Sequence, residues 1–335
     1  NTIAKALLQL NELGEDLTLF VVNSSDVLVG TITDGDIRRG LLKNISIQNT
    51  VDNVMKVKFK FINETSYDFA ILEEIKIQGI QLLPVLDKRG RIKKILNLNI
   101  LQAVLPVDVV IMAGGEGKRL RPLTEKKPKP LLEVGKKPIL EHNIDRLINF
   151  GAEKFWICIG YLGEQIENYF GDGTNKGVSV SYVKEEIPLG TIGAVRNIHG
   201  FRHDHILLIN SDVLTNIDYK KFYLEFLKEG ADLAVATIPY SVDVPYAVLE
   251  TANGHVVSFK EKPTYTYHSN AGIYLIKKEV FKDIPAGFFN ATDLMEALIK
   301  NGQKVISHPI LGYWLDIGKH EDYTKANEDI KHIKF

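Results

Sequence analysis

DVVIMAGGEGKRLRPLTEKKPKPL, residues 108 to 131, is the stretch of this 335-residue sequence that decides the fold. Its apolar run from Asp108 to Met112 predicts a buried strand, and three glycines follow directly. Glycines let main-chain N–H groups approach oxyanions closely, and fixed cations complement a polyphosphate. The cations of this stretch are Lys118, Arg119, Arg121 and Lys129, the last held between two prolines. The stretch therefore predicts a strand followed by a phosphate-binding loop, with a triphosphate as its natural ligand.

Two familiar glycine motifs do not fit this loop. A P-loop would need a glycine where Met112 stands and a Ser or Thr where Arg119 stands. A dinucleotide fingerprint would need a third glycine where Leu120 stands. Both a P-loop ATPase and a dehydrogenase are excluded on these grounds.

The sequence after the loop alternates between helical and strand patterns. A helix is expected after Lys137, with apolar residues one turn apart and an end at Gly151. Strands are expected at 154–159, 178–183, 205–209 and 231–236, and Asn253-Gly254 predicts a hairpin. This order is typical of an α/β fold with a Rossmann-like, doubly wound, mostly parallel sheet.

The composition is that of an ordinary globular chain. The net charge of -1 supplies no general basic field for nucleic acid or an anionic membrane surface. No apolar segment approaches the roughly 18 residues of a membrane span. The single cysteine, Cys158, lies in an apolar run and is expected to be buried and inert, which fits a cytoplasmic location. The sequence begins at Asn1 without a methionine, so its natural start is expected to lie further upstream.

The loop motif GGEGKRLRPLTEKKPKPL resembles the signature of the sugar-1-phosphate nucleotidyltransferases, also called NDP-sugar pyrophosphorylases. The resemblance runs from about Asp108 to about Asn327 and includes EEIPLGTIGAV (185–195), NSDVL (210–214), EKP (261–263) with NAGIY (270–274), and YWLDIG (313–318). It implies in-line attack of a sugar 1-phosphate on the α phosphorus of a nucleoside triphosphate. Since the nucleophile is already an anion, charge neutralisation and alignment matter more than acid–base catalysis.

The resemblance assigns site residues by motif. It implies that Arg119 contacts the triphosphate, Lys129 the α phosphate and Lys262 the sugar phosphate. Asp212 and Asp316, each at the end of an apolar strand, are expected to hold Mg²⁺. The expected nucleotide-binding residues are Ala113, Gly114, Gly115, Gly117, Lys118, Glu185 and Gly190, and the expected sugar-binding residues are Glu261, Asn270 and Gly272.

Glu185 suggests which base is bound. It occupies the position where uridylyl and thymidylyl members of the family typically carry glutamine. A carboxylate accepts from both donors on the pairing edge of guanine, so GTP is favoured. The alternative is that Glu185 faces solvent and that Glu186 or the main chain recognises the base. The sugar is less determined: domain order favours glucosamine 1-phosphate, with mannose and heptose 1-phosphates as rivals.

The first 105 residues contain an internal repeat. LTLFVVNSSDVLVGTIT (17–33) aligns with QLLPVLDKRGRIKKILN (81–97), and each copy predicts a helix, two strands and a second helix. The repeat resembles a tandem pair of CBS (cystathionine beta-synthase) domains, an α+β module, with its first copy shortened at the front. The predicted domains are therefore residues 1–105 and 107–335.

The CBS resemblance implies one nucleotide site. Thr33 and Asp36 match the family's ligand signature, which implies an adenine nucleotide, whereas Asn97 and Ile100 replace the two residues in the second copy. A pair that only mediates dimerisation is the alternative, and a homodimer is expected in either case. A catalytically silent, nucleotide-sensing regulatory subunit is the rival to an enzyme for the whole chain.

Overall fold

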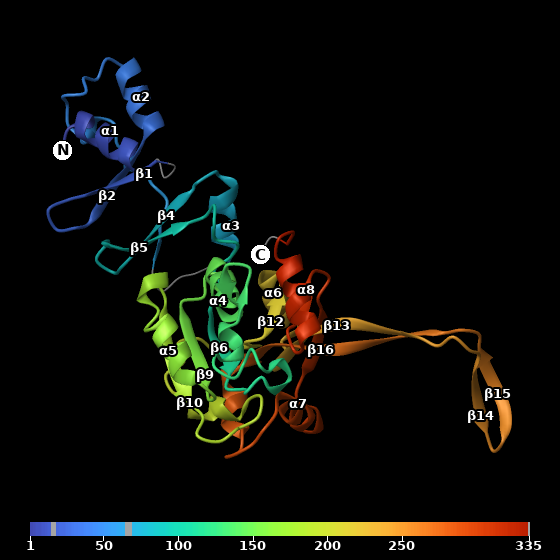
Figure 1. The fold of residues 1–335 in the computed structure, drawn as a ribbon. Coiled ribbons are helices and arrows are strands. Elements are labelled where there is room, and N and C mark those ends of the chain that lie inside the picture. The colour runs from blue at the N-terminus through green and yellow to red at the C-terminus, as the bar shows by residue number, and fades with distance from the viewer. Residues whose placement is uncertain (15–17, 64–68, 334–335) are drawn as a thin grey trace. The chain divides into compact units, whose positions relative to one another are not determined.

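The chain divides into two compact units, Asn1–Val104 and Leu105–Phe335 (Figure 1). The computed structural model describes residues 1–14, 18–63 and 69–333. The first unit contains α1 (Ile3–Glu12), β1 (Thr18–Val22), β2 (Leu28–Thr33), α2 (Asp34–Leu42), η1 (Val51–Asn53), β3 (Ile62–Asn63), α3 (Phe69–Ile77), β4 (Leu82–Leu86) and β5 (Ile92–Asn97).

The two hairpins of the first unit repeat each other at an offset of 64 residues. Thr18 pairs with Thr33 at the end of the β1–β2 hairpin, and Leu82 pairs with Asn97 at the end of β4–β5. Each hairpin also has its bulge at the equivalent position, between Val21 and Val22 in the first and between Val85 and Leu86 in the second. Equal register and equal bulges mean that the sequence repeat is a structural repeat as well.

The prediction of a helix after the second hairpin is wrong. Residues 98–100 form a turn and no helix follows before the second unit begins. Asn97 Oδ1 accepts the main-chain N–H of Asn99 at 3.0 Å, a local bond that competes with helix initiation. In the first copy, by contrast, Thr33 and Asp36 form a capping box that starts α2.

The second unit is built on a seven-stranded, mostly parallel sheet with the order β10-β9-β6-β11-β16-β13-β17. Only β16 runs antiparallel to its neighbours. The strands are β6 (Val107–Ala113), β9 (Lys154–Ile159), β10 (Ser179–Lys184), β11 (His205–Asn210), β13 (Leu233–Asp243), β16 (Thr264–Lys277) and β17 (Val305–Pro309). The doubly wound sheet and the strands expected at 154–159, 178–183 and 205–209 are therefore confirmed, each within a residue.

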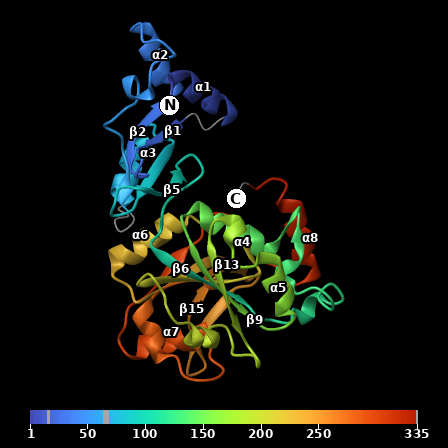
Figure 2. The same cartoon turned by 90° about the vertical axis from the view of Figure 1, so that its left-hand side faces the viewer.

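Helices cover both faces of this sheet. Leu294 and Leu298 of α7 (Ala291–Lys300) pack with sheet residues such as Val110 and Cys158. On the other side, α4 (Ile139–Asn149) meets the start of α6 (Tyr219–Glu229), where the Phe150 and Tyr219 rings lie edge to face at 5.3 Å (Figure 2). Cys158 is fully buried as expected, and burial raises the pKa of its thiol. The remaining helices are α5 (Gly163–Phe170) and α8 (His320–Asp329), with the short η2 (Lys118–Leu120), η3 (Lys129–Leu131), η4 (Thr174–Lys176), η5 (Gly193–Asn197) and η6 (Lys278–Asp283).

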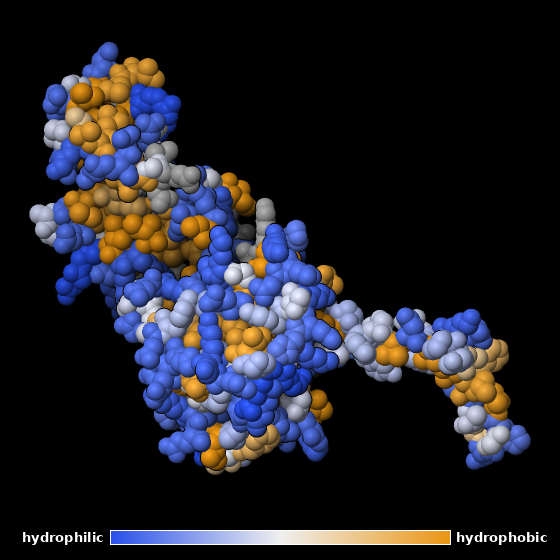
Figure 3. All heavy atoms as spheres, in the orientation of Figure 1, coloured by the Kyte–Doolittle hydropathy of each residue, from blue (hydrophilic) through white to orange (hydrophobic). Residues whose placement is uncertain are grey.

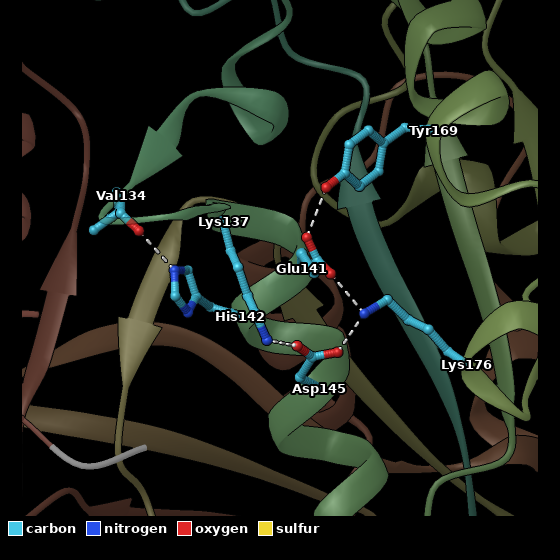
Figure 4. Close-up of polar contacts among 7 residues, drawn as sticks. All are labelled: Val134, Lys137, Glu141, His142, Asp145, Tyr169 and Lys176. Carbon is cyan, nitrogen blue, oxygen red and sulfur yellow. Dashed lines mark hydrogen bonds and ion pairs between the residues drawn. The ribbon is translucent and has the colours of Figure 1, made fainter.

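A polar network fixes the outer side of α4 (Figure 4). Asp145 accepts from Lys137 and from Lys176, each at 2.6 Å. Glu141, one turn earlier, accepts from Lys176 at 2.7 Å and from the Tyr169 hydroxyl at 2.7 Å. The network joins α4 to η4 and α5, and so anchors the helix that follows the glycine loop.

Two short strands beside the main sheet join distant parts of the chain. β12 (Val213–Thr215) pairs antiparallel with β18 (Trp314–Asp316), and Val213 lies opposite Asp316. Their shared core includes Leu214 and Ile317, together with Ile139 at the start of α4. β7 (Glu133–Val134) and β8 (Lys137–Pro138) form a second small pair. The β12–β18 pair therefore holds the NSDVL segment (210–214) next to the YWLDIG segment (313–318).

β13 and β16 continue beyond the sheet as a two-stranded ladder that carries a hairpin at its end (Figure 1). That hairpin is β14 (Val248–Ala252) and β15 (His255–Lys260). Its turn residues Asn253 and Gly254 both have positive φ, 50° and 81°, which confirms the predicted tight turn. Among the described residues, no helix combines the length and apolar character needed to cross a membrane.

Candidate functional site

A cavity of about 520 Å³ opens where the strand order of the main sheet reverses. β6 and β11 are adjacent and parallel there, with Met112 opposite Asn210, although β9 and β10 separate them in sequence. Ligands of doubly wound sheets bind at such a switch point, outside the carboxyl ends of the strands. The cavity is lined by Met112, Gly114, Gly115, Glu116, Gly117, Lys118, Arg119, Lys129, Pro130, Glu185, Pro188, Gly190, Thr191, Asn210, Ser211, Asp212 and Phe288.

The glycine loop is held open by its own contacts. Gly117 has φ +62°, and a Cβ there would lie 3.1 Å from Cβ of Lys129 and 3.1 Å from Cγ2 of Thr124. The fully buried Thr124 donates its hydroxyl to the Gly117 carbonyl oxygen at 2.9 Å. At Gly115, by contrast, nothing lies within 4 Å of a Cβ position, so a ligand can approach the main chain. Sequence analysis did not single out Thr124, although it stands within the quoted motif.

Lys129 connects the loop to two carboxylates. Its ammonium group forms an ion pair with Asp212 and lies 3.9 Å from Oδ1 of Asp316. The two aspartates are neighbours because β12 pairs with β18 and because Ile317 donates its main-chain N–H to the Asp212 carbonyl oxygen at 3.0 Å. Lys129 itself is 9% exposed, in a turn stiffened by the prolines on either side of it. The structure thus brings together three residues that the sequence placed in separate motifs.

The carboxylate pair has the character of a cation site. Burial raises the pKa of Asp316 and the nearby Asp212 carboxylate raises it further, while Lys129 and Arg119 lower it. Asp316 Oδ1 is buried without a hydrogen-bond partner among the described residues. An orphaned carboxylate oxygen beside a second carboxylate suits a hard divalent ion such as Mg²⁺, which prefers oxygen ligands. No group of three or more His, Cys, Asp or Glu side chains gathers as metal ligands in the part of the chain that the structure describes.

Arg119 stands between the loop and the β18 turn. It is an exposed residue of the cavity wall, and a Cβ at Gly318 would lie 3.2 Å from its Nη2 atom. Lys118 is also exposed and forms an ion pair with Glu116 at 3.1 Å within the same loop. The cavity therefore has cations on its open side as well as at its base.

Glu185 forms part of the opposite wall. Its Oε2 atom accepts the main-chain N–H of Leu189 at 3.1 Å, and a Cβ at Gly114 would lie 2.8 Å from its Oε1 atom. Burial raises the pKa of Glu185, against the Leu189 hydrogen bond, which lowers it. Glu186 is exposed and does not line the cavity. Of the two adjacent glutamates, Glu185 is the one that lines the cavity.

The predicted sugar residues fall into two groups. Gly272 lies against the cavity, since a Cβ there would be 2.6 Å from Asn210 Nδ2, and Asn270 Oδ1 accepts its main-chain N–H at 2.9 Å. Glu261 and Lys262 lie between β15 and β16 on the projecting ladder, exposed and outside the cavity wall. The structure does not bring these two residues to the cavity of their own chain.

Several residues of the cavity wall had no role in the sequence-based assignment, and three of them are Asn210, Thr191 and Phe288. Asn210 ends β11 and lies within the quoted NSDVL segment, so its position at a strand end could have indicated it. Thr191 follows Gly190 in the turn after Glu185, and its hydroxyl accepts the main-chain N–H of Ala291 at 2.8 Å. Phe288 comes from a loop before α7 that carries no motif, so no sequence signal pointed to it. Ala113, which was predicted to bind nucleotide, is buried at the end of β6 and is not in the wall.

The first unit has a cavity of its own, of about 370 Å³. Thr33 and Asp36 both line it and are bonded to each other, with the Thr33 hydroxyl donating to Asp36 Oδ2 at 2.7 Å. Burial would raise the pKa of Asp36, but hydrogen bonds from Thr33 and Arg39 hold it below its usual value. Four cations also line this cavity: Arg38, Arg39, Lys56 and Lys60.

Fold and cavity together define an α/β protein that presents a glycine loop, a buried lysine and two carboxylates at the switch point of its sheet. The family model described as Nucleotidyl transferase matches residues 108–333, and the chain belongs to this family. The match lies in the second unit, so the CBS resemblance of the first unit remains a prediction.

Relatives and solved structures agree with this assignment. A mannose-1-phosphate guanylyltransferase of Mycobacterium tuberculosis is 33% identical over 232 residues, 67% of this chain and 64% of the relative. A D-glycero-alpha-D-manno-heptose 1-phosphate guanylyltransferase of Aneurinibacillus thermoaerophilus is 33% identical over 237 residues, 68% of this chain and 99% of the relative.

Among solved structures, HddC from Yersinia pseudotuberculosis complexed with GMP-PN has a TM-score of 0.52 and 29% identity, covering 67% of this chain and 99% of that one. A putative glucose-1-phosphate thymidylyltransferase from Bacillus anthracis has a TM-score of 0.56 and 27% identity, covering 68% and 97%.

Proposed function

We propose that the protein transfers a nucleotidyl group from GTP to a sugar 1-phosphate, with release of pyrophosphate. An oxygen of the sugar phosphate forms a bond to the α phosphorus of GTP. The bond between that phosphorus and the α–β bridging oxygen breaks, and pyrophosphate leaves with the electron pair. No proton needs to move in this step, because the nucleophile is already ionised.

The observation that carries the proposal is the meeting of Lys129 with Asp212 and Asp316 at the open glycine loop. Two anions must approach each other in this reaction, so the site has to neutralise charge and hold the reactants in line. Arg119 on the open side and Lys129 at the base supply fixed positive charge on both sides of the loop. Main-chain N–H groups near Gly115 would hold the triphosphate between them.

Asp212 and Asp316 would hold a magnesium ion, because their carboxylates are adjacent and one Asp316 oxygen has no hydrogen-bond partner among the described residues. When bound, the ion supplies positive charge to the phosphate oxygens. Lys129 already contacts the same carboxylates, and its positive charge offsets part of their negative charge. In this arrangement the lysine lies between Asp316 and Asp212, and Asp212 is the one of the two that lines the cavity.

Guanine is the base that we propose. Glu185 faces the cavity with a carboxylate that can accept from both donors of the guanine pairing edge, and two relatives with 33% identity are named as guanylyltransferases. The same two names support a mannose or heptose 1-phosphate as acceptor. Glucosamine 1-phosphate, favoured by domain order, remains a third candidate.

A matrix of reactions tests the proposal: four nucleoside triphosphates against glucosamine, mannose, glucose and heptose 1-phosphates, with pyrophosphate release as the readout. We expect GTP to give the highest rate with one of these sugars. Asp212→Ala should lower that rate at least about a hundredfold, whereas the control Asp204→Ala, an exposed aspartate on the same unit, should leave it unchanged. Absence of pyrophosphate in every combination would instead support a regulatory subunit without activity.

For the first unit we propose a weakly bound adenine nucleotide. Its cavity combines the Asp36 carboxylate, an acceptor for ribose hydroxyls, with cations such as Arg38 and Lys56 that can meet phosphates. Titration calorimetry with ATP and AMP should show binding that Asp36→Ala abolishes. Because Asp36 also caps α2, thermal unfolding of the variant must be compared with that of wild type. Absence of heat in the wild-type titration would refute the nucleotide site and leave dimerisation as the role of this unit.

A further inference from the structure

The ladder that projects from the second unit, residues 238–269, is here called the arm (Figure 1). Its two strands pair without interruption from Ile238 opposite Ser269 to Asp243 opposite Thr264. Val244 then donates its main-chain N–H to the Pro263 carbonyl oxygen at 3.0 Å, and the β14–β15 hairpin follows. Every residue of β15 is exposed.

The exposed surface of the arm carries apolar and aromatic side chains among polar ones (Figure 3). Tyr240 and Tyr267 lie opposite each other and are 59% and 58% exposed. Toward the tip, Tyr246 is 75% exposed and Phe259 is 66% exposed, and Leu249 is paired with Phe259. A two-stranded ribbon is at best marginally stable in water and needs a surface to cover its apolar side chains.

The arm cannot find that surface on its own unit while its ladder persists. Thr237, which pairs with the exposed Asn270, is the last buried residue before the arm, and Lys262 precedes Asn270 by eight positions. At about 3.3 Å per residue, this spacing places Lys262 roughly 25 Å away from Asn270. Asn270 is itself next to Gly272, which contacts the cavity residue Asn210. Folding the hairpin back onto this cavity would require breaking the ladder.

The cavity of a second copy of the chain offers apolar side chains that the arm could cover. Two exposed apolar residues lie at the cavity: Phe288 lines it and is 65% exposed, and Ile187, which follows the two glutamates, is also 65% exposed. The four arm aromatics would each bury roughly 150–250 Å² if fully covered, and they are 58–75% exposed, so together they present roughly 400–600 Å² of apolar surface on each arm. Two arms exchanged about a two-fold axis, with the surfaces that they cover, would bury roughly 1,600–2,400 Å², enough for a stable dimer.

We infer that the arm of one copy covers the nucleotide cavity of a second copy and delivers Lys262 and Glu261 to it. This inference rests on the proposed function. It assigns to an exchanged arm the two sugar-site residues that the structure does not bring to the cavity of their own chain. Lys262 would then supply the cation for the sugar phosphate, and each site of the dimer would be built from two chains.

Mixed dimers test this arrangement directly. Arg119→Ala and Lys262→Ala chains, co-expressed with different tags and purified through both tags, form dimers with one doubly substituted site and one intact site if the arm is exchanged. We expect each variant alone to be nearly inactive and the mixed dimer to recover about half of the wild-type rate. A control dimer of Arg119→Ala with Asp212→Ala should recover nothing, because both changes lie in the body that holds the cavity. A background rate in the first mixed dimer would overturn the inference.

Sedimentation tests the same interface without an activity measurement. Wild type should be a dimer at micromolar concentration, and a double variant, Tyr246→Ser with Phe259→Ser, should dissociate at a clearly higher concentration than wild type with an unchanged circular dichroism spectrum. Ile299→Ser, at an exposed isoleucine of α7, is the matched control and should stay dimeric. A wild-type monomer, or a double variant whose dimer dissociates at the same concentration as that of wild type, would overturn the inference. Failure of wild type to release pyrophosphate would instead count against the proposed function and leave this result standing.

Discussion

Replacement of Lys129 by methionine removes the charge that compensates Asp212 and Asp316 while keeping an unbranched, apolar side chain. At 3.9 Å from Asp316 and an effective dielectric constant of about 20, the lysine contributes about 4 kcal/mol of attraction to that pair. The Asp316 side chain is 45% exposed, so solvent screening lowers this to about 2 kcal/mol. With the closer Asp212 contact included, we expect Lys129→Met to lower the free energy of unfolding by about 2–4 kcal/mol.

The effect on catalysis should be larger than the effect on stability. A fixed cation next to the reacting phosphate is typically worth about a hundredfold to a thousandfold in rate. Pyrophosphate release at saturating GTP measures the rate, and urea unfolding measures stability. Lys126→Met, at an exposed lysine three positions earlier, is the matched control and should change neither. A Lys129→Met enzyme within threefold of the wild-type rate would refute the role given to this lysine.

Three further predictions concern other parts of the second unit. Asp108 is fully buried and accepts both the main-chain N–H of His203, at 3.2 Å, and its ring N–H, at 3.0 Å. Asp108→Ala should therefore lower the free energy of unfolding in urea by about 3–5 kcal/mol without changing the rate per folded molecule. A decrease of less than about 1 kcal/mol would contradict this prediction. Burial would raise the pKa of Asp145, but Lys137 and Lys176 hold it below its usual value, so its contribution to stability is present above about pH 4 and is lost as the pH falls below that. Asp145→Asn should therefore be less stable than wild type at pH 7, and the difference should become smaller as the pH falls below about 4; an equal difference at pH 7 and pH 3 would be evidence against the ion pairs. Glu185→Gln should shift the ratio of GTP to UTP turnover by at least about tenfold toward UTP, because a carboxamide matches the uracil edge better; an unchanged ratio would show that another group recognises the base.

Much of the fold could be predicted because its signals are local. The apolar strand before the glycine loop, the helix after Lys137 and the turn at Asn253-Gly254 each follow from spacing within a few residues. The repeat of the first unit could be predicted for the same reason. Each copy forms a local hairpin, and the two hairpins have the same register and a bulge at the equivalent position. The helix expected after the second hairpin failed because Asn97 forms a local turn where Thr33 caps a helix.

The site was only partly predictable because its residues meet through long-range pairing. Strand ends indicated Asp212 and Asp316 separately, but only the β12–β18 pairing shows that Lys129 lies against both. Phe288 carries no motif, and its place in the cavity depends on how the loop before α7 folds. The arm was hidden as well: Tyr240 and Tyr267 lie in segments whose alternation of polar and aromatic residues gives no hint that the strands leave the sheet.

The central claim is that the glycine loop and the Lys129 cluster together hold a nucleoside triphosphate. A crystal structure of the chain grown with GTP and Mg²⁺ tests it most directly. We predict the triphosphate over Gly114 to Gly117, the base beside Glu185 and a metal ion between Asp212 and Asp316. Nucleotide bound elsewhere on the second unit, with this loop empty at millimolar GTP, would contradict the claim.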